Sequence, residues 1–402
     1  MNLFIIFLLL DYWSLNAISA TNTEVAIIRR DLNFTGMVNY DGFLSETHTV
    51  RTKDGYILTL YRVSSPNCSA LRDSEPIMFM HGLFLSGDDC ITPGPSGSHC
   101  YEYASACLDV WVPNARGTVY SRSHISLNPD TDSEYWNFSF DEMAQYDMPA
   151  VIDYVINATN KNQITYIGHA QAVATLLNLC AAKPEYNAKI KVGFGLSPTA
   201  WLYNCRFSVI QIDGALSTVL TGLIEAGLNA EFLPRGGVYQ PFVKLLCGTT
   251  DLSYPACSDL LFAVLGNDSY QITEDTMKVL TGHLPGGTSL KNFNRWGQIY
   301  KNGFTKYDHG SVKNLLEYGT LTPPVFDLSN VTMKWIFITS YGDYVSNVTD
   351  VDTLIANVSN ATKCIVSDKT FGHLDYLFGK DVPTMITPMI TTYVDTGKFE
   401  CL

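Results

Sequence analysis

The sequence is poor in basic residues and shows no repeats, low-complexity tracts or Pro/Gly-rich linkers. Its 402 residues include 26 Lys and Arg against 39 Asp and Glu, for a formal net charge of −13. Nucleic-acid binding needs a basic patch or stripe, so we expect no nucleic-acid partner. With 46% hydrophobic residues, the chain can form one large core, or a core domain with an inserted subdomain.

Long hydrophobic runs are also missing after the first residues, so the sequence predicts no transmembrane segment. Leu3–Leu10 is unbroken and apolar, but Asp11 ends it well short of a membrane span. Small residues follow at Ala17, Ser19 and Ala20. We therefore expect residues 1–20 to be a secretory signal peptide, although the usual basic start is absent. A short N-terminal anchor or a buried strand is the alternative.

Metal-binding spacings are absent, because no two cysteines lie two residues apart and no histidine pair completes a set. We expect no metal and no cofactor. The ten cysteines are an even number, which is compatible with disulfides in an oxidising compartment. Asn-x-Ser/Thr glycosylation acceptors occur at Asn33, Asn67, Asn137, Asn157, Asn267, Asn330, Asn347, Asn357 and Asn360. Together these features predict export, to the extracellular fluid or to a lysosome-like compartment.

Short apolar runs alternate with amphipathic stretches, which is typical of an α/β protein with a mostly parallel central sheet flanked by helices. Asp54-Gly55 predicts a hairpin. The strands we expect are Ile77–Met80, Leu108–Val112, Ile164–Ile167 and Lys334–Thr339. Helical periods run through Glu142–Val155 and Val173–Cys180.

The alternation fades between Trp201 and Tyr318 into helical segments punctuated by glycine. The expected layout is a core formed by residues 21–200 and 319–402, with a mainly helical cap inserted at residues 201–318.

One strand–turn–helix junction carries the most information. Ile164–His169 runs through Ala170 directly into a helix, which is the context of the Gly-x-Ser-x-Gly nucleophile elbow. Gly168 keeps the first small position, but Ala172 replaces the second glycine and Ala170 replaces the serine. A methyl group cannot attack a carbonyl. By itself, such a turn would more often be structural.

The order of the remaining groups favours a hydrolase of the α/β-hydrolase fold. In that fold the nucleophile is followed by an acid and then a histidine. Asp343 follows a predicted strand, and His373 lies in a later loop. Leu83, after His81-Gly82, and Gln171 could supply the backbone N–H groups of an oxyanion hole. No other residue replaces the nucleophile convincingly: Ser197 lacks the elbow spacing and Ser96 lies in a Gly/Pro loop.

At this point the chain resembles the acid lipases, the group of gastric and lysosomal acid lipases and their insect relatives. The resemblance extends from about Val38 to Thr396. It is carried by motifs at Lys53–Leu58, His81–Leu83, Asp109–Gly117, Tyr120–His124, Glu142–Ala150, Pro285–Ser289, Thr322–Pro324 and Gly372–Asp381.

The resemblance implies that Asp343 is the triad acid, His373 the triad base, and Leu83 and Gln171 the oxyanion donors. Cys247 and Cys257 match a cap disulfide of the family, and this pair would close a short loop. The nucleophile does not carry over, because Ala170 stands in its place. The family's substrates, triacylglycerols and cholesteryl esters, imply an apolar pocket.

Three functions follow from this reading. The first is a secreted lipase homologue without hydrolytic activity that binds or carries a lipid or fatty-acid ester, with transient contact to a lipid surface. The second is an impaired or atypical ester hydrolase. The third is a structural or interaction protein on the lipase scaffold, which predicts a filled pocket and a large exposed apolar patch. The sequence does not decide the oligomeric state.

Overall fold

The computed structural model describes residues 23–237, 240–241 and 270–402. The expected signal peptide at residues 1–20, the pair Cys247 and Cys257 and the sequon at Asn267 lie outside these ranges. No helix within the described ranges is long and apolar enough to cross a membrane.

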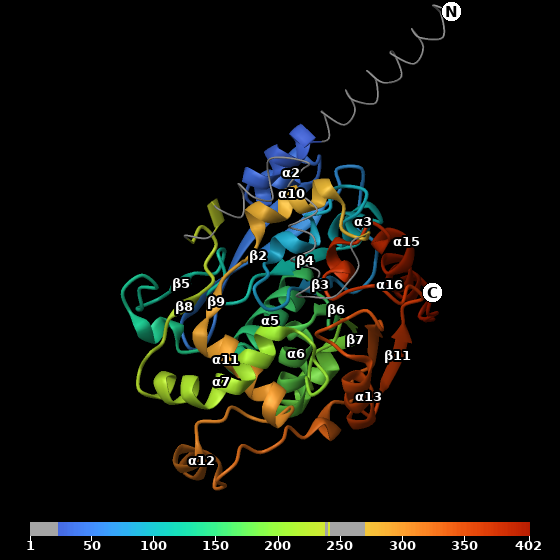
Figure 1. The fold of residues 1–402 in the computed structure, drawn as a ribbon. Helices are drawn as coiled ribbons and strands as arrows, with labels where there is room; N and C mark the ends of the chain where they lie inside the picture. The colour runs from blue at the N-terminus through green and yellow to red at the C-terminus, as the bar shows by residue number, and fades with distance from the viewer. Residues whose placement is uncertain (1–22, 238–239, 242–269) are drawn as a thin grey trace, which may run out of the picture.

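The chain folds around a nine-stranded sheet in the order β1-β2-β4-β3-β6-β7-β10-β11, with β5 paired to β2 (Figure 1). Every pairing from β4 across to β11 is parallel, whereas β1, β2 and β5 pair in antiparallel fashion. This mostly parallel sheet confirms the expected fold class. The strands are β1 (Leu44–Arg51), β2 (Tyr56–Ser64), β3 (Ile77–Met80), β4 (Val110–Pro113), β5 (Ser123–His124), β6 (Ile164–His169), β7 (Ile190–Leu196), β10 (Trp335–Thr339) and β11 (Ala361–Ile365).

Helices cover both faces of this sheet (Figure 1). The α-helices are α2 (Phe34–Tyr40), α3 (His99–Ser105), α4 (Phe140–Glu142), α5 (Met148–Thr159), α6 (Gln171–Ala182), α7 (Ser208–Glu225), α10 (Glu274–His283), α11 (Leu290–Asn302), α12 (Ser311–Tyr318), α13 (Val348–Asn357), α14 (Asp375–Phe378), α15 (Val382–Met385) and α16 (Thr387–Thr396). Short 3₁₀ turns occupy Gly87–Cys90, Ser133–Trp136, Pro184–Lys189 and Leu328–Asn330.

Alternate side chains of the central strands pack in two separate hydrophobic cores, because successive residues of a strand point to opposite faces of the sheet. On β3, Met78 and Met80 pack in the core that also holds residues of α5 and α6. Ile77 and Phe79 pack on the other face with residues of α2, α3 and α16. All four β3 side chains are buried, which explains why the strand reads as a continuous apolar run.

The predicted strands and the hairpin at Asp54-Gly55 are confirmed, with ends shifted by at most a few residues. The predicted helical stretch over Glu142–Val155 is confirmed, although it is not a single α-helix. A π-helical turn, Met143–Asp147, separates α4 from α5. The carboxylate of Asp147 is buried there, where it accepts hydrogen bonds from the Arg116 guanidinium. The π-helical turn, which is wider than an α-helical turn, therefore coincides with a buried ion pair. The helix does not present a continuous apolar face there.

No described residue between β7 and β10 adds to the central sheet. This stretch holds α7, α10, α11, α12 and a two-stranded sheet of β8 (Glu231–Phe232) and β9 (Thr288–Ser289). We keep residues 201–318 as the proposed cap on a core of residues 21–200 and 319–402.

Helices α7 and α11 of this segment lie side by side (Figure 1). Glycines permit their close approach: a Cβ on Gly214 would lie 2.5 Å from the Tyr300 ring, and one on Gly297 would lie 2.5 Å from the Asp213 carboxylate. Asp213 is buried and accepts a 2.8 Å hydrogen bond from the N–H of Gly297. Its other oxygen has no partner within the described chain.

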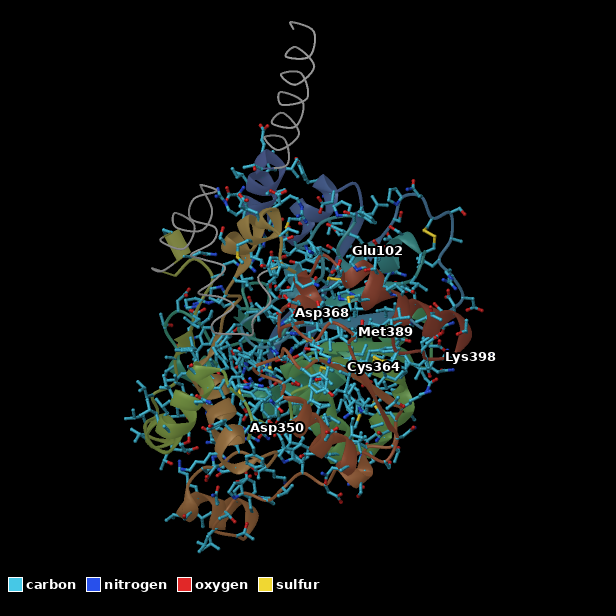
Figure 2. All side chains as sticks on the ribbon, turned by 45° about the vertical axis from the view of Figure 1, so that its right-hand side comes forward. Glu102, Asp350, Cys364, Asp368, Met389 and Lys398 are labelled. Carbon is cyan, nitrogen blue, oxygen red and sulfur yellow. A yellow bond between two sulfur atoms is a disulfide. The ribbon has the colours of Figure 1, made fainter. Side chains whose placement is uncertain are left out.

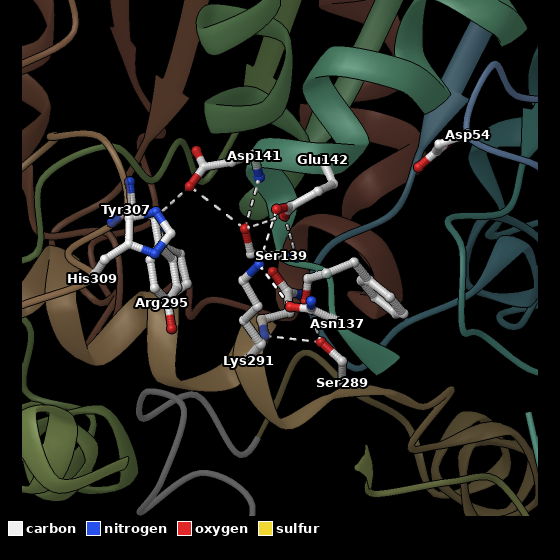
Figure 3. A network of polar contacts seen from close by, with 12 residues as sticks. Asp54, Asn137, Ser139, Asp141, Glu142, Ser289, Lys291, Arg295, Tyr307 and His309 are labelled. Atoms are coloured by element: carbon white, nitrogen blue, oxygen red, sulfur yellow. Dashed lines mark hydrogen bonds and ion pairs between the residues drawn. The ribbon is translucent and has the colours of Figure 1, made fainter. Parts of the chain in front are cut away.

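Charged side chains join α11 to the core (Figure 3). Lys291 Nζ lies 3.0 Å from Glu142 Oε1, and Arg295 Nε lies 2.8 Å from Asp141 Oδ2. Both cations are buried, so the loss of one partner would leave an uncompensated buried charge. The ion pairs therefore fix α11 relative to α4.

Three disulfides support the inference from the cysteine count: Cys68–Cys107, Cys90–Cys100 and Cys364–Cys401. The last one joins β11 to the C-terminal tail, and Figure 2 labels Cys364 close to Met389 of α16. Cys180 and Cys205 are buried free thiols.

The seam between α7 and α11 gives a pH prediction. Burial raises the pKa of Asp213 from 3.8 to about 7, although the hydrogen bond from Gly297 opposes this rise. A raised carboxyl pKa means that the folded state holds its proton more tightly than the unfolded state. Asp213 thus favours folding most below about pH 4. This stability is lost as the pH rises towards 7.

Between pH 4 and 8, Asp213 should lower the free energy of unfolding by a few kcal/mol, given a pKa shift of this size. We expect Asp213→Asn to remove this decrease. Urea unfolding at several pH values measures the free energy of unfolding. Asp73→Asn, in an exposed ion pair with Lys161, is the matched control and should keep the wild-type profile. Identical profiles for wild type and Asp213→Asn would contradict the assignment.

Candidate active site

The turn between β6 and α6 has the geometry of a nucleophile elbow without the nucleophile. Ala170 adopts φ 49° and ψ −114°, a conformation that non-glycine residues rarely take. Its N–H donates to the carbonyl of Leu196 at 3.0 Å. A Cβ on Gly168 would lie 2.6 Å from the Tyr166 ring, so the small residue before the turn is required. The turn is therefore sharp although its tip carries a methyl group and no hydroxyl.

The structure brings Asp343 and His373 together beside this turn. Asp343 follows β10, and His373 lies just before α14. His373 Nδ1 is 3.1 Å from Asp343 Oδ1 and 3.2 Å from Oδ2. The backbone N–H groups of Val345 and Ser346 each donate to Oδ1 at 2.8 Å, which fixes the carboxylate. This is an acid–base pair with its imidazole held in one orientation.

Ser197 joins this pair, a position that sequence reasoning did not predict. Its hydroxyl donates to Asp343 Oδ2, and its oxygen lies 2.6 Å from His373 Nδ1. It follows β7, which ends next to the elbow strand β6. Its signal was weak, since Gly195-Leu196-Ser197-Pro198 carries no recognised motif. Ser197 is fully buried and contacts the nitrogen that faces Asp343, so it occupies the rear of the imidazole.

The two expected oxyanion donors lie on either side of the elbow. Gln171 is the first residue of α6, so its N–H has no acceptor within the helix. The N–H of Leu83, in the turn after β3, likewise donates to no group of the described chain. The side-chain oxygen of Gln171 accepts from Asn292 Nδ2 at 2.9 Å and Trp296 Nε1 at 2.8 Å, both on α11. The start of α6 is thereby tied to the proposed cap.

A cavity of about 370 Å³ opens next to Ala170. Leu83, Gln171 and His373 line it, together with aliphatic and aromatic side chains from both the core and residues 201–318. Its volume lies within the range of small-molecule sites, roughly 300–1,000 Å³. None of its lining residues is Asp, Glu, Lys or Arg. The site is therefore an open apolar pocket with a few convergent polar groups.

A buried charge cluster holds the loop that carries Leu233, one of the residues lining this cavity. Leu233 lines the cavity, and Arg235 Nη2 lies 2.7 Å from Asp88 Oδ2. His283 Nδ1 and the Tyr120 hydroxyl also contact the Asp88 carboxylate, each at 2.9 Å. Burial would raise the pKa of Asp88, but Arg235, His283 and these hydrogen bonds outweigh burial and hold the pKa well below 3.8. The ion pair thus persists in acidic medium.

Other histidines near the elbow stay neutral. Burial lowers the pKa of His81 to about 4, and its Nε2 accepts from the N–H of Ala115 at 3.1 Å. Burial, reinforced by the neighbouring His373, holds the pKa of His169 well below its usual range. Within the described chain, no cluster of His, Cys, Asp or Glu could hold a metal ion.

The strained turn gives a stability prediction. A non-glycine residue in such a conformation costs about 1–3 kcal/mol, whereas glycine adopts it readily. Since glycine also loosens the unfolded chain, we expect Ala170→Gly to raise the free energy of unfolding by a net ~1 kcal/mol. Chemical denaturation measures the change. Ala174→Gly, inside α6, is the control and should lower it by about 1 kcal/mol. Equal losses in both variants would mean that Ala170 carries no strain.

Comparison with known proteins places this geometry in a family. The family model described as "Partial alpha/beta-hydrolase lipase region" matches residues 34–94. A solved Sulfolobus solfataricus structure described as a lipase superposes with a TM-score of 0.60 at 14% identity, covering 89% of this chain and 95% of that one. This likeness supports the α/β-hydrolase fold.

Relatives extend over most of the chain. Lipase 1 of Drosophila melanogaster is 32% identical over 86% of this chain and 75% of its own length. Bovine gastric triacylglycerol lipase is 31% identical over 91% of this chain and 92% of its own. Human lipase member K is 29% identical over 89% of both. With this coverage, and with an elbow, an acid and a histidine in lipase order, the chain belongs to the acid lipase family.

Proposed function

We propose that this protein is an exported acid lipase homologue that does not hydrolyse esters and instead binds a lipid or fatty-acid ester in the cavity beside Ala170. The observation that carries the proposal is Ala170 itself, set in a preserved elbow at the edge of an open apolar cavity. The chemistry is missing from a site whose binding surface remains.

Loss of the nucleophile is decisive for the usual route. Removing the serine of a serine hydrolase lowers turnover by about a million-fold. Ser197 does not replace it, because its hydroxyl is fully buried behind His373 and does not line the cavity. Ser96 is exposed on a loop and lines no part of the cavity. Asp343 and His373 remain as an acid–base pair with nothing to activate.

The open cavity favours a ligand-binding protein over a purely structural one, since a scaffold without a ligand predicts a filled pocket. The outer face of α7 adds support for transient contact with a lipid surface. Exposed apolar side chains recur there at helical spacing: Val209, Ile212, Leu216, Val219 and Leu223. Val209 also lines the cavity, so this apolar face extends to the pocket.

Export is supported by the disulfides, which persist in oxidising compartments. None of the eight described sequon asparagines is buried. Six are exposed and Asn137 and Asn347 are half-buried. We propose glycosylation at these sites, with Asn357 and Asn360 close enough to compete. The destination is the extracellular fluid or a lysosome-like compartment.

A second candidate is an impaired ester hydrolase. The observation in its favour is the intact Asp343–His373 contact and the two unpaired N–H groups of Leu83 and Gln171. Oxyanion stabilisation and binding alone retain roughly 10³–10⁴-fold catalysis over water when a triad is removed. An impaired hydrolase that uses His373 as a general base would show further turnover, and that turnover would be lost when His373 is changed.

The deciding experiment compares the wild type with the Ala170→Ser, Ala172→Gly double variant in a fatty-acyl ester hydrolysis assay. We expect the wild type to hydrolyse the ester no faster than the background reaction, which uses no nucleophile at residue 170. The double variant should gain at least about 10³-fold, because the acid, the base and the N–H donors are in place. Ala174→Ser, which adds a hydroxyl to α6 away from the elbow, is the matched control and should gain nothing.

Wild-type turnover comparable to that of the double variant would contradict the proposal that the protein does not hydrolyse esters. Residual turnover lost in His373→Gln would favour the impaired hydrolase, and an acyl group found covalently attached to Ser197 would make Ser197 the nucleophile. A silent double variant would show that the oxyanion site or the pocket has also diverged.

A further inference from the structure

We propose that the vacated site selects the free carboxyl group of a long-chain fatty acid over the corresponding ester. The inference rests on the proposed lipid-binding function and specifies its ligand. The chemistry of the polar groups around Ala170 distinguishes the two ligand classes.

The first polar element is a pair of backbone N–H groups that can donate hydrogen bonds to an anion. The N–H of Gln171 opens α6, a helix of 12 residues, where the helix dipole favours negative charge. The N–H of Leu83 borders the same cavity, and neither group has an acceptor in the described chain. A single carboxylate oxygen can accept from both.

The second element is His373, which offers one unused nitrogen. Its Nδ1 is engaged by Asp343 and Ser197, while its Nε2 makes no hydrogen bond to a group of the described chain. His373 is only 7% exposed as a residue and lines the cavity. Because Nδ1 is turned towards Asp343, Nε2 is the ring nitrogen left to contact a ligand in the cavity. A fatty acid brings the proton that can lie between its carboxyl group and Nε2.

A fatty acid satisfies both elements, and an ester satisfies one. The first carboxyl oxygen of the fatty acid accepts hydrogen bonds from the N–H groups of Leu83 and Gln171. Its second oxygen accepts a hydrogen bond from His373 Nε2–H. One proton is shared between the carboxyl group and Nε2, so no bond to carbon forms or breaks. The alkoxy oxygen of an ester carries no charge and bears an alkyl group. Charge-assisted hydrogen bonds are roughly twice as strong as neutral ones, so the acid binds better.

The surroundings do not oppose an anion. No acidic side chain lines the cavity, so a carboxylate meets no like charge at its wall. The acyl chain has an apolar wall that includes Leu202, Phe207, Ile210 and Leu284.

The test compares binding of oleate and methyl oleate to the full protein by titration of tryptophan fluorescence, since Trp296 lines the cavity. We expect oleate to bind at least about tenfold more tightly, one charge-assisted contact being worth this ratio. His373→Gln should abolish the preference without weakening methyl oleate. His48→Gln, on β1 away from the cavity, is the matched control and should keep the preference.

A readout that does not depend on a variant is the ¹³C resonance of carboxyl-labelled oleate. A protein-bound resonance distinct from that of vesicle-bound oleate, and displaced by excess unlabelled oleate, is the expected result. Equal affinities for oleate and methyl oleate would overturn the selectivity and leave lipid binding standing. Binding of neither would overturn the proposed function as well. A preference that survives in His373→Gln would overturn the role of His373.

Discussion

The backbone turn at Ala170 is the constraint on which the site depends. It forces one residue into a strained conformation between β6 and α6, and it fixes the first N–H groups of α6 at the cavity. Gly168 makes the turn possible, because a larger residue would collide with Tyr166. Since the turn belongs to the packing of strand against helix, it survives without a hydroxyl at its tip. The site is organised by the fold and not by the nucleophile.

The elbow is also joined to the proposed cap. Asn292 and Trp296 of α11 hold the Gln171 side chain, while Lys291 and Arg295 of the same helix pair with the core. One helix therefore positions the start of α6 and closes one side of the cavity. The pocket is therefore tied to the packing of the fold and does not depend on a hydroxyl at residue 170. Binding and packing depend on the same contacts.

Sequence reasoning predicted the strands with continuous apolar runs and the positions of Ala170, Asp343 and His373. It missed β7, because Gly193 and Gly195 weaken the strand signal. The structure explains these glycines: they pair in register with Trp335 and Phe337 of β10, whose rings fill the space a Cβ would need. Without β7, the position of Ser197 directly after that strand could not be predicted. Sequence reasoning also missed β11, an edge strand with little apolar content. Such contacts between distant segments leave no local pattern.

The disulfide between Cys364 and Cys401 has a consequence for the edge of the sheet. Strand β11 is the last strand of the sheet, and an unpaired edge is a template for pairing with another chain. The tail carrying Cys401 lies against this edge, with its sulfur 3.7 Å from the carbonyl of Ile365. Reduction of the bond would release the tail from the end of this edge strand. The attachment of the tail therefore depends on an oxidising environment.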